Sequence, residues 1–330
     1  MEARLHGAPA VAAVGLAPHA MRRQRLGDAL FRGLTQAFAV GVLVLLGAVI
    51  VTLAAGAMPA FRKFGFFGFL ASDAWNPVKD NFGALPAIYG TVVTAVIAML
   101  IAVPVAFGIA IFLTELCPPV LRRPIGMLIE LLAAIPSIIY GVWGLLVVAP
   151  VLQTTLQPFL IGTLGDIPIV GVLFQGPPYG LGMLTAGLIL AVMVLPFIAA
   201  VLRDVFMTVP AMLRESAYGM GATTAEVVRA IVIPHSRVGI VGAVMLALGR
   251  ALGETMAVTF VVGNSHHIRA SLLAPATTIS ATLANEFTEA VSSTYTSSLI
   301  ALGLILYLIT CIVLAAANFM LWRLSAKEGA

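Results

Sequence analysis

The chain has 330 residues, of which 61% are hydrophobic and only 10% are charged. An ordinary soluble domain is about 45–50% apolar and about 25% charged, and part of every soluble fold must face water, so this composition excludes a soluble protein. The formal net charge of +4 comes from basic residues scattered at the ends of apolar runs, which indicates membrane topology and not a nucleic-acid partner.

Six apolar segments are long enough to cross a membrane. A helix needs about 20 mainly apolar residues to span about 30 Å of hydrocarbon, and long continuous runs exclude a β-barrel, whose strands alternate. We therefore predict an all-α polytopic membrane protein. Pro104 and Pro136 fall inside the second and third segments and are expected to kink them. The segments are residues 34–58, 86–113, 127–150, 181–202, 238–263 and 297–322.

The basic residues orient these spans. Most lysines and arginines lie in the N-terminal tail, the connections after the second and fourth spans, and the C-terminal tail. By the positive-inside rule these parts are cytoplasmic, and an even number of spans also requires both termini on one side. The first apolar run is too long for a cleavable signal peptide and is expected to stay as an anchor. The expected segments are a tail 1–33, a transmembrane helix 34–58, an outside loop 59–85, a core 86–322 and a tail 323–330.

The cytoplasmic connection 203–237 has a helical pattern of its own. Pro210 opens a helical stretch, and Gly221 permits the positive backbone angle of a sharp turn after it. Thr223 is a candidate N-cap for a second short helix, which is expected to stop before Pro234. Two interpretations stay open on composition alone: a docking element for another protein, or an amphipathic stretch that lies on the membrane surface.

The segment ESAYGMGATTAEVVRAIVIP in this connection resembles the EAA signature of ABC importer permeases. In that family the helix–turn–helix is a coupling helix, which sits in a groove on a separate ATP-binding subunit. Ser216 and Ile233 depart from the alanine and leucine of the signature and leave the helix–turn–helix pattern intact. The matching positions are Glu215, Ser216, Ala217, Gly221, Ile231, Ile233 and Pro234.

Three further stretches, residues 130–145, 248–264 and 271–290, are similar to the PstC-type permeases of phosphate-specific ABC importers. The resemblance implies a type I (MetI-like) importer permease fold over 86–322, with the coupling helix between the fourth and fifth transmembrane helices. It also implies a permease subunit that carries inorganic phosphate across the bacterial inner membrane. The implied partners are a PstA-type second permease, a PstB-type ATPase dimer at residues 211–234, and a periplasmic phosphate-binding protein.

No intrinsic enzyme is expected. The sequence contains no G-x-x-x-x-G-K-[ST] loop, so this chain is expected to carry no cofactor, and ATP and Mg are expected on the partner ATPase. No Ser-His-Asp, Cys-His or paired-carboxylate arrangement appears. His266 and His267 are adjacent and point in different directions, without further ligands at metal spacing, so we expect surface histidines and no metal site.

Arg250 and Glu254 are opposite charges inside the fifth apolar segment. A spacing of four places both on one face of a helix, and Arg250 is expected near the middle of the membrane, where a charge costs about 2.5–3.5 kcal/mol or more. One hypothesis is that Arg250 binds phosphate through its guanidinium and that Glu254 neutralises it when the anion is absent. The alternative is an ion pair, within the helix or to a second permease, that only fixes packing.

Three weaker candidates accompany this pair. Gly249 and Gly253 have the G-x-x-x-G spacing that lets another helix approach closely, so a packing role is expected. Glu130 lies at the start of the third span, where a place at the cytoplasmic interface is the ordinary interpretation and a role along the substrate path is the alternative.

The residues alone do not name phosphate, which rests on the resemblance. A permease for another oxyanion, sulfate or molybdate, fits the same features. An ion-coupled secondary transporter is a further alternative, which the coupling segment disfavours. The absence of an inverted repeat also counts against it.

Overall fold

The computed structural model describes the backbone of residues 18–168 and 170–328, and the side chains of residues 27–168 and 170–323. Within this part of the chain six helical segments are long and apolar enough to cross a membrane, as predicted. They are Gly27–Phe64, Leu85–Leu116, Ser137–Leu164, Met183–Met207, Thr224–Leu252 and Ser293–Arg323.

The longer helices are α1 (Pro18–Phe64), α3 (Leu85–Ile111), α4 (Pro119–Ala133), α8 (Met183–Met207), α11 (Ile233–Leu252) and α14 (Ser293–Glu328). The shorter ones are α2 (Phe66–Ala71), α5 (Ser137–Trp143), α6 (Ala149–Val151), α7 (Gln157–Leu164), α9 (Ala211–Gly219), α10 (Thr224–Val227), α12 (Met256–Thr259) and α13 (Ile279–Glu286). Strands β1 (Trp75–Asn76) and β2 (Asn81–Phe82) pair antiparallel, with Trp75 opposite Phe82. Four π-helical turns lie within the helical runs: Phe112–Leu116, Gly144–Val148, Leu152–Leu156 and Val228–Val232.

The chain forms two compact units, with the boundary between Thr52 and Leu53. The described part of the first unit is the N-terminal portion of α1. Its large apolar side chains, such as Leu34, Phe38 and Leu45, are exposed in this chain. A helix that is apolar on all sides is stable only against lipid or other helices, so this portion is built to lie in a membrane.

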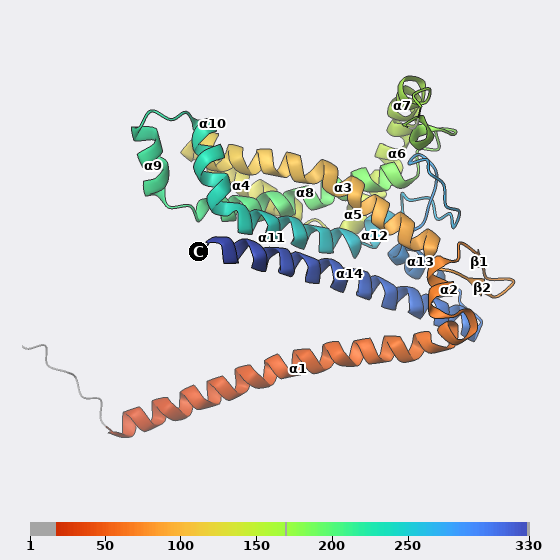
Figure 1. Ribbon diagram of the computed structural model, residues 1–330, viewed down its shortest axis with the longest axis horizontal. Helices are drawn as coiled ribbons and strands as arrows, with labels where there is room; N and C mark the ends of the chain where they lie inside the picture. The colour runs from red at the N-terminus through yellow and green to blue at the C-terminus, as the bar shows by residue number, and fades with distance from the viewer. Residues whose placement is uncertain (1–17, 169, 329–330) are drawn as a thin grey trace, which may run out of the picture. The chain divides into compact units, whose positions relative to one another are not determined.

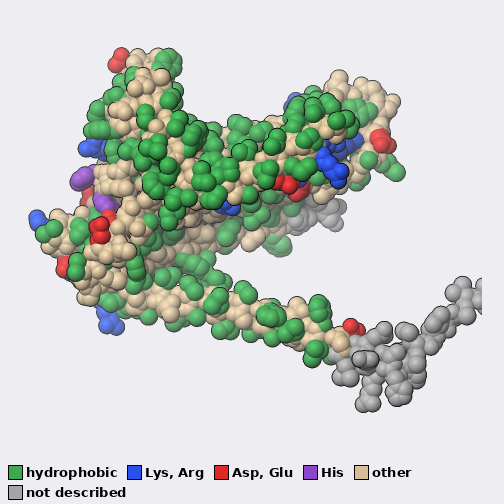
Figure 2. Space-filling view, turned by 180° about the vertical axis from the view of Figure 1, so that it is seen from behind, with side chains coloured by type: hydrophobic (Ala, Val, Ile, Leu, Met, Phe, Trp, Pro, Cys, Tyr) green, Lys and Arg blue, Asp and Glu red, His purple; other side chains and the backbone are tan. Residues whose placement is uncertain are grey.

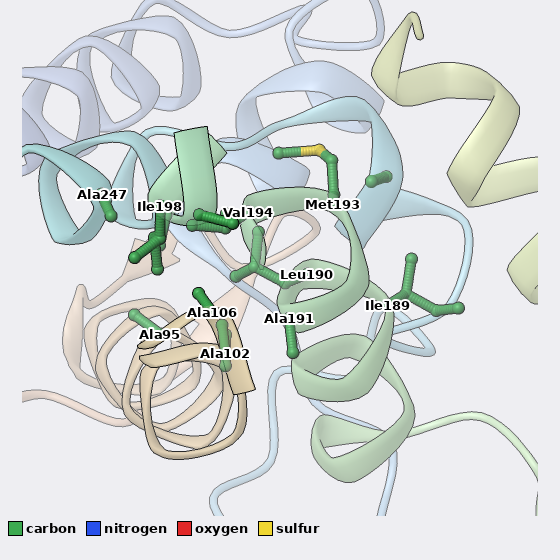
Figure 3. Close-up of a cluster of buried hydrophobic side chains, with 14 of the residues drawn as sticks. Ala95, Ala102, Ala106, Ile189, Leu190, Ala191, Met193, Val194, Ile198 and Ala247 are labelled. Atoms are coloured by element: carbon green, nitrogen blue, oxygen red, sulfur yellow. The ribbon is translucent and has the colours of Figure 1, made fainter. Parts of the chain in front are cut away.

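The second unit is held together by close packing of small side chains between long helices. In this unit α3, α8, α11 and α14 run lengthwise, with α8 and α14 both packed on α11 (Figure 1). A row of buried alanines on α3, including Ala102 and Ala106, faces the larger Leu190 and Ile198 of α8 (Figure 3). Small residues let helices approach closely, and van der Waals packing is what holds helices together where lipid surrounds them.

The ends of the second unit differ from its middle. Helices α9 and α10 lie at one end, while the β-hairpin and α13 lie at the other (Figure 1). In the space-filling view, hydrophobic side chains cover the length between the ends, and charged side chains gather mainly toward the ends (Figure 2). This distribution is the one that a bilayer selects, because charges are costly in hydrocarbon and helices satisfy their own backbone there.

Prolines divide the third predicted span differently from the sequence expectation. Residues 127–150 do not form one kinked helix: α4 ends at Ala133, and the spanning segment begins only at Ser137, after Pro136. A proline has no N–H and disfavours helical geometry in the residue before it, so Pro136 separates two helices. Pro104, in contrast, lies inside α3 without ending it.

Candidate functional site

Arg250 lies in the last turn of α11, with its side chain exposed. Its guanidinium carbon is 5.5 Å from the ring centroid of Phe197 on α8, a cation–π distance. No hydrogen bond or ion pair reaches its guanidinium from the described part of the chain. The C-terminal end of a helix carries partial negative charge, which favours a cation there. The structure therefore presents a positioned arginine whose hydrogen-bond donors are unused.

Glu254 is not on the same helix as Arg250, which corrects the sequence expectation of one shared face. Helix α11 ends at Leu252, Gly253 forms its C-cap, and the chain becomes helical again only at Met256. Glu254 lies in this break, where its Oε1 accepts from the backbone N–H of Ala257 at 3.5 Å. Among the residues that the structure describes, Arg250 and Glu254 form no ion pair with each other. Helix breaks of this kind line the substrate sites of many transporters.

The two glycines beside these charges occupy different environments. A Cβ placed on Gly249 would lie 3.6 Å from Leu314 of α14, an ordinary contact at the α11–α14 packing face. Gly253 has left the helix and caps it. The G-x-x-x-G spacing therefore does not form one continuous helical stripe, and only Gly249 faces a neighbouring helix of this chain.

The predicted helix–turn–helix at 203–237 is present in the structure. Helix α9 is followed by Gly221, whose φ of 89° lies in the left-handed region that favours glycine. Thr223 caps α10: its hydroxyl accepts from the N–H of Glu226 and the Glu226 carboxylate accepts from the N–H of Thr223, which is a capping box. Glu215 and Ser216 are exposed on α9, while Ala217 on the same helix is buried.

The second helix of this element does not stop before Pro234, as the sequence suggested. It continues from α10 through the π-helical turn Val228–Val232, where Ile231 is half-buried, directly into α11. Pro234 occupies the first turn of α11. A proline is tolerated where the helix widens locally or begins, because its missing N–H then costs little. The helix–turn–helix is thus joined rigidly to the helix that carries Arg250.

A buried ion pair that the sequence analysis did not single out ties α9 to the second span. Arg214 Nη2 lies 3.4 Å from Oε1 of Glu115, whose side chain is only 4% exposed. Arg214 also donates to the backbone carbonyl of Phe206 at the end of α8. The signal was available, since Glu115 stands inside the apolar run FLTEL, and a carboxylate in such a run requires a partner.

Glu130 pairs with a basic residue of a neighbouring helix. Its Oε1 accepts from Arg203 Nη2 at 2.8 Å, and Arg203 also pairs with Asp204 at 2.9 Å. The Glu130 side chain is 54% exposed. This pair lies between α4 and the C-terminal part of α8, so Glu130 is placed by an interhelical contact, and Arg250 is not among its partners.

A third polar cluster joins β1, α13, α14 and the loop that carries His266, at the other end of the second unit. Glu286 of α13 accepts from His266 Nε2 at 2.7 Å, from the Trp75 indole N–H at 2.8 Å and from the Tyr295 hydroxyl at 2.6 Å. The rings of Trp75 and His266 stack at 5.0 Å. The expectation of a surface histidine is therefore wrong for His266, although His267 is exposed.

The electrostatics of this cluster stabilise a charged carboxylate. Burial alone raises the pKa of Glu286, but the hydrogen bonds from His266, Tyr295 and Trp75 together outweigh burial and hold that pKa below its ordinary value. Among the described residues no group of three or more His, Cys, Asp or Glu side chains is arranged to hold a metal ion. The cluster is a hydrogen-bonded clamp that holds β1, α13, α14 and the loop with His266 together.

Six spanning helices, a capped helix–turn–helix at one end and an unpaired arginine at a helix break define a class: a polytopic α-helical transport permease. A family model described as "Binding-protein-dependent transport system inner membrane component" matches residues 102–323, and the chain belongs to this family. It is a multi-pass membrane protein of the ABC importer permease type, with the type I importer permease fold.

Named relatives and solved structures agree with this family. The chain is 64% identical over 310 residues to the "Phosphate transport system permease protein PstC" of Mesorhizobium japonicum, with 94% of each chain covered. It is 54% identical to the protein of the same name from Pasteurella multocida, covering 92% of this chain and 94% of that one. A chain of a bacterial ABC transporter involved in alginate import matches with a TM-score of 0.61 at 16% identity, covering 92% of this chain and 98% of that one. The last likeness concerns the fold alone.

Proposed function

We propose that this chain is the permease subunit of an ATP-driven importer that carries inorganic phosphate across the bacterial inner membrane. The observation that carries the proposal is the 64% identity to a permease named for phosphate transport, which extends over 94% of both chains. The exposed guanidinium of Arg250 supports it, because a planar fork of N–H donors matches the oxygens of phosphate.

The two charged residues near the break after α11, Arg250 and Glu254, act on the anion in the transport path. Phe197 holds the Arg250 guanidinium in place, and no protein acceptor in the described chain competes for its donors. Phosphate oxygens accept from these donors, which replace part of the water that the anion loses on entering the path. Glu254 stands four residues further along, without pairing to Arg250. Its negative charge weakens anion binding, and a transport path needs that weakening so that the substrate leaves.

The partners and orientation follow from the same assignment. Helix α9 and the turn at Gly221 form the surface that contacts an ATPase dimer of PstB type, with Glu215 and Ser216 exposed for that contact. A PstA-type permease completes the path as a heterodimer, and a periplasmic phosphate-binding protein docks at the end that carries α13 and the β-hairpin. Both termini lie in the cytoplasm, as the distribution of basic residues indicates.

Energy enters this chain through contacts and not through bound nucleotide. ATP and Mg belong to the partner ATPase, and the chain itself carries no catalytic residue, cofactor or metal in this proposal. Closure of the ATPase dimer moves α9, and the continuous helix from α10 through α11 transmits that motion to Arg250.

The test is phosphate uptake by proteoliposomes that contain both permeases and the ATPase, with the binding protein supplied outside. We expect uptake that requires ATP inside the vesicle and the ATPase subunit. Uptake driven by an imposed ion gradient without ATP would instead identify a secondary transporter. Preferential uptake of sulfate or molybdate over phosphate would assign the path to another oxyanion.

A further inference from the structure

A cavity of about 390 Å³ lies between α4 and the C-terminal end of α8, and neither Arg250 nor any residue of α9 or α10 lines it. Its volume is within the range of about 300–1,000 Å³ that small-molecule sites occupy. The lining combines basic and apolar side chains. The residues that matter here are Arg122, Arg123, Met127, Glu130, Arg203 and Met207.

The three arginines of this cavity have different partners. Arg203 is neutralised by Glu130 at 2.8 Å and by Asp204 at 2.9 Å. Arg122 has one long contact, from Nη2 to the carbonyl of Cys117 at 3.5 Å. Within the described residues neither Arg122 nor Arg123 pairs with a carboxylate. The cavity therefore keeps positive charge from two arginines, while the third is fixed in its wall.

Gly126 shapes the wall that holds Arg203. A Cβ at this buried position would lie 2.6 Å from Arg203 Nη1, closer than real Cβ contacts come. The guanidinium therefore lies against the backbone of α4, in space that any side chain would occupy. This arrangement places Arg203 in the cavity wall and does not involve the charges of Arg122 and Arg123.

Helix α4 has the character of an interfacial helix. It has 15 residues, too few to cross a bilayer. Beyond its basic first turns it exposes large apolar side chains, among them Leu128 and Leu131. A short helix with basic residues beside an apolar face lies at the membrane surface, with its apolar side among acyl chains.

We propose that this cavity binds the headgroup of an anionic phospholipid, with the phosphodiester oxygens at Arg122 and Arg123. Basic pockets between transmembrane helices at the membrane surface recognise such headgroups. The apolar side chains decide between a lipid and free phosphate, which present the same oxygens. Met127 and Met207 give a free, hydrated anion no partner, whereas they pack against the glycerol and upper acyl carbons of a lipid. The site is independent of the transported substrate.

Native mass spectrometry of the purified transporter complex, titrated with phosphatidylglycerol, tests this site. We expect one phosphatidylglycerol bound per chain with higher affinity than phosphatidylcholine, and weaker binding by about tenfold or more in Arg122→Gln/Arg123→Gln. The matched control is Arg32→Gln/Arg323→Gln, which removes the same charge at two exposed arginines outside the cavity and should keep wild-type affinity. Equal losses in both double variants would mean non-specific attraction and overturn the proposal.

Two further measurements test whether the lipid binds in this cavity: binding to Gly126→Ala, and competition by inorganic phosphate. Gly126→Ala leaves the net charge unchanged and displaces Arg203, so it should also weaken phosphatidylglycerol binding if the cavity is the site. Millimolar inorganic phosphate should not displace the lipid, and displacement would assign the cavity to the free anion instead. If the double variant is not recovered folded, Arg122→Gln and Arg123→Gln singly carry the same comparison, and unchanged affinity in both would refute the site.

Discussion

Two arginines of this protein are held in opposite ways. Arg214, in the helix–turn–helix, contacts a buried carboxylate and a backbone carbonyl, and its side chain is 20% exposed. Arg250, at the end of α11, is exposed, and its guanidinium lies over the ring of Phe197 without a hydrogen bond or ion pair from the described residues. A guanidinium nitrogen that contacts both a carboxylate and a carbonyl joins two parts of the chain, as Arg214 Nη2 does, while a positioned guanidinium without such partners is available to an anion. Under the proposed function, Arg214 belongs to the part that transmits motion and Arg250 to the part that meets the substrate.

The largest effect is expected from removing the unpaired charge. Arg250→Gln should lower phosphate uptake by about a hundredfold or more, because two charge-assisted hydrogen bonds are each worth about 1.5–3 kcal/mol. Thermal stability in detergent should stay near the wild-type value, since no hydrogen bond within the described part of the chain is lost. Arg250→Lys, which keeps the charge but not the fork, should retain partial uptake.

The contrary outcome for Arg250 is equally specific. Uptake near normal in Arg250→Gln would remove this residue from the path. A complex that fails to assemble would show instead that Arg250 holds the two permeases together, as the alternative interpretation of the sequence proposed.

Replacing Arg214, which is paired, should lower thermal stability, whereas replacing Arg250 should not. Breaking one partner of a buried ion pair leaves an uncompensated charge and costs about 3–5 kcal/mol. Glu115→Gln and Arg214→Gln should each lower the midpoint of thermal unfolding, with the lower end of that range expected because Arg214 is partly exposed. Glu115→Leu/Arg214→Met should recover most of the loss, since a packed apolar pair is often as stable as the ion pair.

That double variant also distinguishes structure from transmission. If the pair only stabilises the fold, the apolar double variant recovers ATP-driven uptake together with stability. If the pair links α9 to the second span during the ATP cycle, stability returns while ATP hydrolysis stays uncoupled from uptake. A double variant as unstable as the single ones would contradict the ion pair itself.

These two arginines also show how far the sequence determines the site. The apolar runs predict six spans because membrane insertion depends on local composition. The turn at Gly221 and the cap at Thr223 were predicted because both are local backbone requirements. The pairing of Glu115 with Arg214 joins residues far apart in the chain, and periodicity within one segment carries no information about such contacts.

The prediction that Arg250 and Glu254 share one helical face was wrong for a different reason. A separation of four predicts a shared face only while the helix continues, and α11 ends between the two residues at Leu252. Gly253 and the polar residues after it were the available signal for this break, since glycine commonly ends helices. In a strongly apolar segment, hydropathy favours one continuous helix and obscures this local signal.

The cluster around Glu286 extends the comparison to the opposite end of the molecule. Glu286 accepts three hydrogen bonds and its side chain is 17% exposed. A glutamine offers one acceptor oxygen and places an NH₂ against a donor, so Glu286→Gln should destabilise the protein by about 1–3 kcal/mol at pH 7. The control is Glu289→Gln, an exposed carboxylate nearby, which should have little effect.

The pH dependence of this effect has a defined sign. The pKa of Glu286 is lower in the folded protein than in the unfolded chain, so its contribution is fully present above the unfolded value of about 4.3 and is lost as the pH falls through the folded value. The difference in thermal midpoint between wild type and Glu286→Gln should therefore shrink on acidification below about pH 4. A difference that is the same at pH 7 and in acid would contradict the charged clamp.

The smallest effect concerns the turn that follows α9, the helix that carries Arg214. Gly221 has φ of 89°, and an L-residue held in the left-handed region costs about 1–2 kcal/mol. Gly219→Ala is the matched control, because Gly219 lies in the last turn of α9 at an ordinary backbone angle with open space around its Cα. Gly221→Ala should therefore weaken ATP-driven uptake slightly while Gly219→Ala does not. Equal behaviour of the two variants would show that the turn relaxes freely, and transmission would then rest on the Glu115–Arg214 pair alone.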